Sequence, residues 1–102
     1  MKFNDISVII LLYKTPKKLL KNLLNYKNFK ILIFDQSYDL KTKKILQNLL
    51  PKIEYYGLSK KNYGFAKAQN FLIKKVKTKY FFSTQADINI KESSILKLKK
   101  LL

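Results

Sequence analysis

The chain has 102 residues and a formal net charge of +16, so it is short enough to be a single domain with one hydrophobic core. It contains no cysteine and no histidine, which excludes disulfides, thiolate metal sites and the commonest general base. All 22 basic residues are lysine, whereas base readout and bidentate phosphate clamps favour arginine.

Residues 6–13 form a continuous apolar run rich in β-branched side chains. Such a run predicts a strand that is buried on both faces, as in a parallel sheet. It is shorter than the ~20 residues that a membrane span needs and lacks the cleavage site of a secretory signal, so we expect a cytoplasmic chain. Thr15 and Pro16 then predict an N-cap and a first helical position. Four leucines continue at helical spacing: Leu19, Leu20, Leu23 and Leu24.

A second strand of the same buried type is predicted over residues 30–35. It ends at Asp35, and a polar turn follows it. Asp39 is expected to cap a helix over residues 40–50, which Pro51 would close. Residues 53–57 predict a short third strand.

The next segment combines a glycine-containing loop over residues 62–65 with an amphipathic helix. Four apolar residues share one face of that helix: Phe65, Ala68, Leu72 and Val76. A fourth strand over residues 80–84 ends in a polar turn that carries Asp87. A last helix is predicted from about Lys91 onward, and its apolar stripe consists of Ile95, Leu96, Leu98, Leu101 and Leu102.

Strands and helices therefore alternate four times along the chain. This order predicts an α/β fold in which a mainly parallel sheet lies between two layers of helices, as one domain over residues 1–102. In such folds ligands bind at the carboxyl ends of the strands. The polar turns after Asp35 and around Asp87 are expected to meet at that edge.

Two motifs in the second half of the chain resemble those of the family 2 glycosyltransferases of the GT-A fold. Residues 62–70 read N-Y-G-F-A-K-A-Q-N, and the fourth strand ends in Gln85-Ala86-Asp87. The family has an N-x-G-F-A-x-A-x-N loop and helix and an acidic D-x-D turn at these places. Here Gln85 replaces the first acid, a change that also occurs in deoxysugar transferases and suggests a rhamnosyltransferase-like subgroup.

The resemblance extends to Tyr13 at the end of the first strand and to Asp35, Ser37 and Asp39 after the second. It covers the family's donor-binding half, and the acceptor-binding half, which normally supplies the catalytic base, has no counterpart. The resemblance implies that the chain binds a nucleoside-diphosphate sugar for transfer to a glycan or lipid-linked acceptor. It also implies a second chain that supplies the acceptor half, and little activity from this chain alone.

The resemblance also assigns roles to single residues. Asp35 would accept the imide N–H of a pyrimidine base, Tyr13 would stack on that base, and Asp87 would bind Mg²⁺ or Mn²⁺ together with the donor diphosphate. Each has a simpler structural reading, as a turn aspartate, a tyrosine at the edge of the core and a helix-capping aspartate respectively.

Further donor contacts are expected from the loop and helix that follow the third strand. Asn62 and Gly64 would shape the loop over the nucleotide, and Gly64 is expected to meet a backbone need such as φ > 0. Gln69 would reach the donor from the helix, and Gln85 would contact it from the fourth strand. Lys67 could also reach a phosphate, although an abundant lysine is more often simply solvated.

Two other classes of function remain open from the sequence. One is a truncated nucleotide-binding module without turnover. The other is a basic α/β domain that binds nucleic acid or an anionic membrane through its lysines, although a coding bias toward lysine also explains the charge. We expect no specific nucleic-acid partner, and an anionic membrane surface is a further candidate partner at the inner face of the membrane.

Overall fold

The computed structural model describes residues 3–50 and 52–101, so Pro51 and Leu102 lie outside the described residues. Four strands form one parallel sheet in the order β3-β2-β1-β4. The strands are β1 (Phe3–Leu12), β2 (Phe29–Asp35), β3 (Ile53–Leu58) and β4 (Tyr80–Gln85). The helices are η1 (Lys17–Tyr26), α1 (Leu40–Leu49), α2 (Phe65–Ile73) and α3 (Glu92–Lys100).

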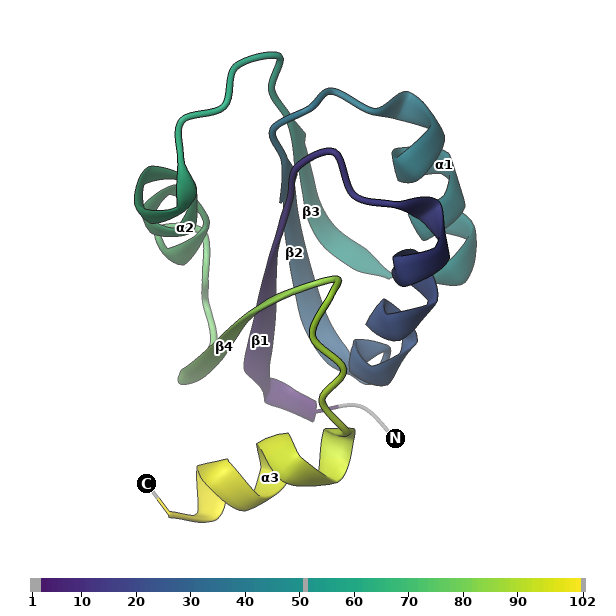
Figure 1. Ribbon diagram of the computed structural model, residues 1–102. Helices are drawn as coiled ribbons and strands as arrows, with labels where there is room; N and C mark the ends of the chain where they lie inside the picture. Colours follow the sequence, from purple (N-terminus) through teal and green to yellow (C-terminus); the bar gives the residue numbers. More distant parts are fainter. Residues whose placement is uncertain (1–2, 51, 102) are drawn as a thin grey trace.

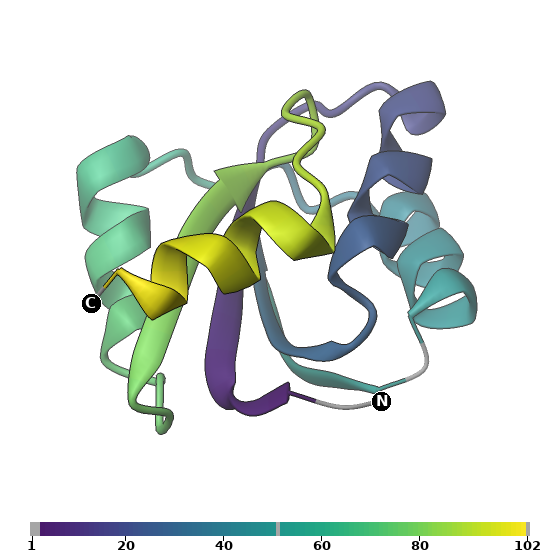
Figure 2. The same cartoon turned by 90° about the horizontal axis from the view of Figure 1, so that it is seen from below.

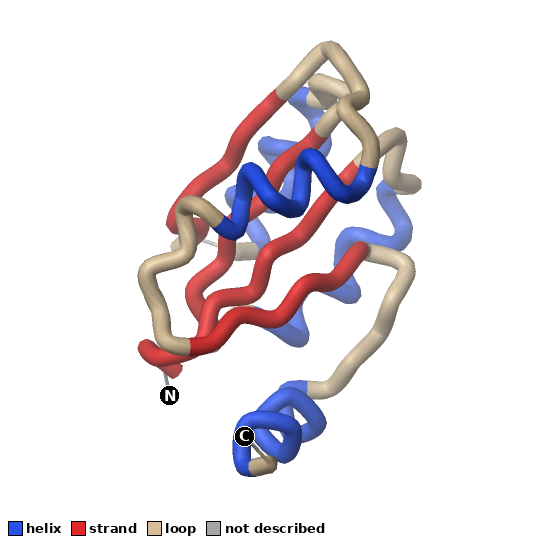
Figure 3. Tube along the Cα trace, turned by 90° about the vertical axis from the view of Figure 1, so that its left-hand side faces the viewer, coloured by secondary structure: helices blue, strands red, loops and turns tan. Residues whose placement is uncertain are grey.

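The helices lie on both faces of the sheet, which confirms the predicted α/β architecture. Helices η1 and α1 cover one face and α2 covers the other (Figures 1 and 3). Helix α3 lies near the amino ends of the strands, where Lys99 forms an ion pair with Asp5 and Asn28 donates to Glu92 at 2.8 Å (Figure 2). None of the helices in the described residues is long and apolar enough to cross a membrane.

The central strand β1 explains the continuous apolar run in the sequence. Ile6, Val8 and Ile10 point into the core beneath η1 and α1, whereas Ile9 and Leu11 point toward α2. Both sets are buried because the sheet is covered on both sides.

Two helix starts test the predicted caps. Asp39 caps α1 as expected, because its Oδ1 accepts the N–H of Thr42 at 3.0 Å. The predicted Thr15 cap is wrong: η1 is a 3₁₀ helix that begins one residue later, and Pro16 occupies the N-cap position with no side-chain cap bond. The backbone supplies that contact instead, since the N–H of Leu19 donates to Pro16 O at 3.0 Å.

Two predicted apolar faces are only partly buried. In α3, Ile95 is buried, but Leu98 and Leu101 are 53% and 82% exposed, because the described part of the chain provides no layer that covers them. In the segment of α2, Ala68 and Leu72 are buried as predicted. Phe65, by contrast, is exposed at the first turn, where it lines an open pocket.

Candidate functional site

An open pocket of about 430 Å³ lies at the carboxyl ends of β1 and β4, beside the first turn of α2. Polar turns after three strands and the loop before α2 form its walls, as expected for a parallel α/β sheet. Five of the seven residues that the sequence predicts for the nucleotide and metal sites line this pocket: Tyr13, Asn62, Gly64, Gln85 and Asp87.

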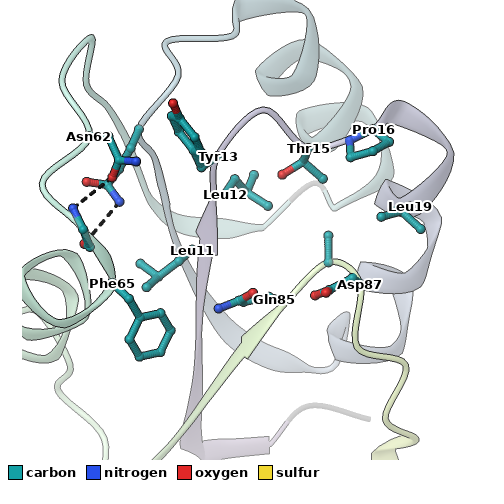
Figure 4. Close-up of a pocket in the computed structure, with 13 residues that line it drawn as sticks. Leu11, Leu12, Tyr13, Thr15, Pro16, Leu19, Asn62, Phe65, Gln85 and Asp87 are labelled. Carbon is teal, nitrogen blue, oxygen red and sulfur yellow. Dashed lines mark hydrogen bonds between the residues drawn. The ribbon is translucent and has the colours of Figure 1, made fainter.

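The pocket-lining side chains come from opposite walls. Figure 4 shows Asn62 and Phe65 on the side of α2, and Gln85 and Asp87 on the side of β4. Tyr13 lies at the end of β1, with about half of its surface exposed. A ligand between these walls would meet the rings of Tyr13 and Phe65, the amides of Asn62 and Gln85, and the carboxylate of Asp87.

Gln36 fixes the loop that forms the α2 side of the pocket. This side chain is buried, and its Oε1 accepts the N–H of Tyr63 at 2.6 Å while its Nε2 donates to the carbonyl of Gly64 at 3.4 Å. Sequence reasoning treated Gln36 only as part of a polar turn. The sequence signal for this role was an amide side chain directly after a buried strand. Such an amide can donate a hydrogen bond to one backbone group of a neighbouring loop and accept one from another.

The loop itself is bent at Gly64, which adopts φ = +86° as the sequence predicts. Its N–H donates to Asn62 Oδ1 at 2.9 Å, a bond drawn dashed in Figure 4. Gly64 is also the N-cap residue of α2, whose first turn carries no acidic side chain. The unpaired N–H groups of a helix start attract anions, so this wall suits a phosphate.

Asp87 is the carboxylate that lines the pocket. It is exposed in a turn closed by a bond from Ile88 N–H to Gln85 O at 3.1 Å. Among residues 3–50 and 52–101 no group of three potential metal-ligating side chains occurs. One carboxylate beside one amide fits a Mg²⁺ or Mn²⁺ ion that takes its remaining ligands from a diphosphate and water.

Asp35 and Gln69 do not line the pocket. Asp35 is only 1% exposed, and its Oδ1 accepts from the N–H and the hydroxyl of Ser37 at 2.8 and 2.5 Å. Gln69 accepts a hydrogen bond from the hydroxyl of Ser83 at 2.7 Å. Lys67 lies in a separate cleft, with its ammonium 5.8 Å from the centre of the Tyr63 ring. Direct ligand contacts from these residues stay predictions.

An ion pair between Lys17 and Asp39 joins the start of η1 to the start of α1, behind the loops that follow β1 and β2. The hydrogen bond from Lys17, and then that from the N–H of Thr42, lowers the pKa of Asp39 from 3.8 to about 2. A lowered pKa stabilises the folded state only while the carboxyl is ionised. This contribution is therefore complete above about pH 4 and is lost as the pH falls toward 2.

We expect Asp39→Asn to lower the free energy of unfolding by less than about 1 kcal/mol at pH 7, because asparagine still caps the helix and an exposed ion pair is weak. Asp39→Ala, which also removes the cap, should cost about 1 kcal/mol more. Urea unfolding between pH 7 and pH 2.5 measures both. The difference between wild type and Asp39→Asn should shrink below pH 4, and a constant difference would contradict the assigned pKa.

Comparison with known proteins relates nearly the whole chain to one family. Residues 7–102 match the family described as Glycosyl transferase family 2. A crystal structure of S. aureus TarS aligns with 98% of the chain at a TM-score of 0.73 and 19% identity, and the match covers 19% of that protein. A crystal structure of S. aureus TarS 1-349 aligns with 98% of the chain at a TM-score of 0.71 and 20% identity.

These TM-scores show that the chain shares the fold of these structures. The chain spans 19% and 32% of the length of the two solved structures. No curated protein matches the chain.

Proposed function

Because the chain belongs to glycosyl transferase family 2, we propose that it binds a nucleoside-diphosphate sugar in the pocket at the carboxyl ends of β1 and β4. The observation that carries this proposal is the convergence of Tyr13, Asn62, Gly64, Gln85 and Asp87 on one pocket. These residues come from three separate segments of the chain, and sequence resemblance singled them out for the donor site.

The walls of the pocket suit different parts of such a donor. Tyr13 offers a half-exposed ring on which a base stacks, an interaction worth ~1–3 kcal/mol. The N-terminus of α2, which begins after Gly64, offers backbone N–H groups to a diphosphate. Gln85 and Asp87 lie across the pocket, where the sugar and the inner phosphate would extend.

Members of this family commonly use divalent metals, and Asp87 is the residue that would hold one here. A bound Mg²⁺ or Mn²⁺ would neutralise charge that develops on the leaving diphosphate. The Gln85 amide replaces a second acid, so we propose that it orients the donor by hydrogen bonding. A replacement of this kind fits a deoxysugar donor.

We expect Asp87→Asn to remove most of the effect of Mn²⁺ on the binding of uridine diphosphate, while binding of uridine itself stays unchanged. In the described part of the chain, Asp87 is the one charged side chain that lines the pocket, and an amide is a much poorer ligand for a hard cation. Calorimetric titration with and without Mn²⁺ measures both quantities. Glu92→Gln is the matched control, because it removes a carboxylate that is bonded to Asn28 near the amino ends of the strands.

If the metal effect survives in Asp87→Asn, Asp87 is a turn residue and not a metal ligand. The same titration tests the function as a whole, with thymidine diphosphate as a second probe. A chain that binds neither diphosphate does not carry the proposed donor site.

For the complete reaction we propose a glycan or lipid-linked acceptor. The lysine-rich surface would draw the domain to the anionic inner face of a membrane, where lipid-linked acceptors lie. A non-catalytic nucleotide-binding module is the second candidate. One observation favours it: Asp87 is the carboxylate that lines the pocket. This one residue would have to serve both as the metal ligand and as the general base.

A further inference from the structure

We propose that Asp35 is a positioning residue, which acts through Ser37 to hold the loop after β1 and thereby places Tyr13 at the pocket. This inference rests on the proposed nucleotide site and changes the part that Asp35 plays in it. The resemblance implies a direct contact between Asp35 and the base, whereas the carboxylate is buried behind the turn that follows β2.

The inference starts from a chain of hydrogen bonds that links Asp35, Ser37 and Lys14. The Ser37 hydroxyl donates its single proton to Asp35 Oδ1 at 2.5 Å. Its oxygen then accepts the backbone N–H of Lys14 at 3.1 Å. A hydroxyl has one proton and two lone pairs, so the carboxylate fixes the direction in which Ser37 can accept.

Lys14 needs such a restraint because its backbone is in the left-handed region, at φ = +48°. This conformation is unfavourable for a residue with a β-carbon, and it persists only where the surroundings hold it. A second bond lies one residue away from Tyr13, from the N–H of Gln36 to the carbonyl of Leu12 at 2.9 Å. Tyr13 is therefore bracketed by two bonds to the loop after β2.

The direction of the Asp35 side chain agrees with this role. Ile33 and Tyr56 belong to the core on the side of α1, and Asp35 follows Ile33 by two residues on the same strand, so it points to the same side. Burial first, and then the charges of Asp35 and Asp39, raise the pKa of Tyr56 well above its usual range. The carboxylate thus lies in the interior on the side of α1 and does not line the pocket.

The first test separates positioning from direct recognition of the base. The probes are uridine diphosphate and 3-methyluridine diphosphate, which lacks the imide N–H. If Asp35 acts through Ser37, Ser37→Ala should weaken both probes by the same factor, about tenfold for one lost hydrogen bond and the loop that it holds. Loss of affinity for uridine diphosphate alone in Asp35→Asn would overturn the proposal in favour of direct contact.

The second test asks whether the backbone of Lys14 carries the effect. In the Ser37→Ala background, Lys14→Gly and Lys14→Ala both remove the lysine charge, but only glycine adopts φ > 0 without strain. We expect the glycine double variant to bind uridine diphosphate about fivefold or more tightly than the alanine double variant. Equal affinities would overturn the proposal.

A third measurement does not depend on nucleotide binding. Amide hydrogen exchange at Lys14 in the ligand-free chain should become roughly tenfold faster in Ser37→Ala, because its acceptor is gone. Unchanged protection would show that the hydrogen-bond chain does not hold this loop. If exchange accelerates but the wild-type chain binds neither probe, the nucleotide site fails while the restraint on the loop stands.

Discussion

Gln36→Leu is expected to remove most of the nucleotide affinity of this chain while the sheet remains folded. Leucine is close to glutamine in size, so the packing at this buried position is kept. It cannot pair with the backbone of Tyr63 and Gly64, and the loop before α2 loses its tether. Two hydrogen bonds at about 1 kcal/mol each correspond to roughly thirtyfold in affinity.

Calorimetry with uridine diphosphate measures the affinity, and circular dichroism with urea unfolding reports whether the fold is intact. Gln47→Leu is the matched control, since it makes the same change at an exposed position of α1. A folded Gln36→Leu variant with wild-type affinity would show that the loop does not contribute to nucleotide binding.

The second expectation is that this chain alone transfers sugar at least about 10²–10⁴-fold more slowly than a complete enzyme. That factor is the typical contribution of general-base assistance to the rate. The remaining described carboxylates are committed elsewhere. Asp5 and Glu92 hold α3, Glu54 lies 4.0 Å from Lys30 on the strands, and Asp35 and Asp39 are bonded within the turn after β2. Among residues 3–50 and 52–101, Asp87 is therefore the one carboxylate at the pocket, and it cannot serve both as the metal ligand and as the base for an acceptor hydroxyl.

A donor-consumption assay measures this directly, with a panel of sugar nucleotides and acceptors. The assay should be repeated after addition of the protein that the neighbouring open reading frame encodes, which is a candidate for the second chain with the acceptor half. Transfer at an enzymatic rate by the 102 residues alone would show that the catalytic base has been overlooked. Activity that requires both polypeptides would identify a split glycosyltransferase.

The parts of the fold that the sequence predicts correctly depend on local patterns. The apolar run in β1 indicates two covered faces, Asp39 is followed by a typical helix, and Gly64 is one of only two glycines. Each of these needs only neighbouring residues. Apolar spacing also located Ala68 and Leu72 in α2, but it could not reveal that Leu98 and Leu101, which follow Ile95 on the apolar stripe of the last helix, are exposed.

The parts that it could not predict depend on contacts between distant segments. Gln36 meets the loop before α2 across 27 and 28 residues, and Ser37 meets Lys14 across 23. No periodicity encodes such pairs. The resemblance assigns Asp35 and Gln69 to the nucleotide site by their position in motifs, which does not show that Ser37 and Ser83 are their hydrogen-bond partners in the fold.

The strand order also determines when during synthesis the sheet can be completed. β1 precedes the other three strands along the chain, yet its second partner is β4, and Ile6 pairs with Tyr80. Until the ribosome has released that distant segment, the most apolar strand of the protein has one unpaired edge, and pairings of such long sequence separation form slowly. Nascent chains that end before β4 would thus expose an unpaired strand edge that is prone to aggregation. We expect such chains to bind chaperones.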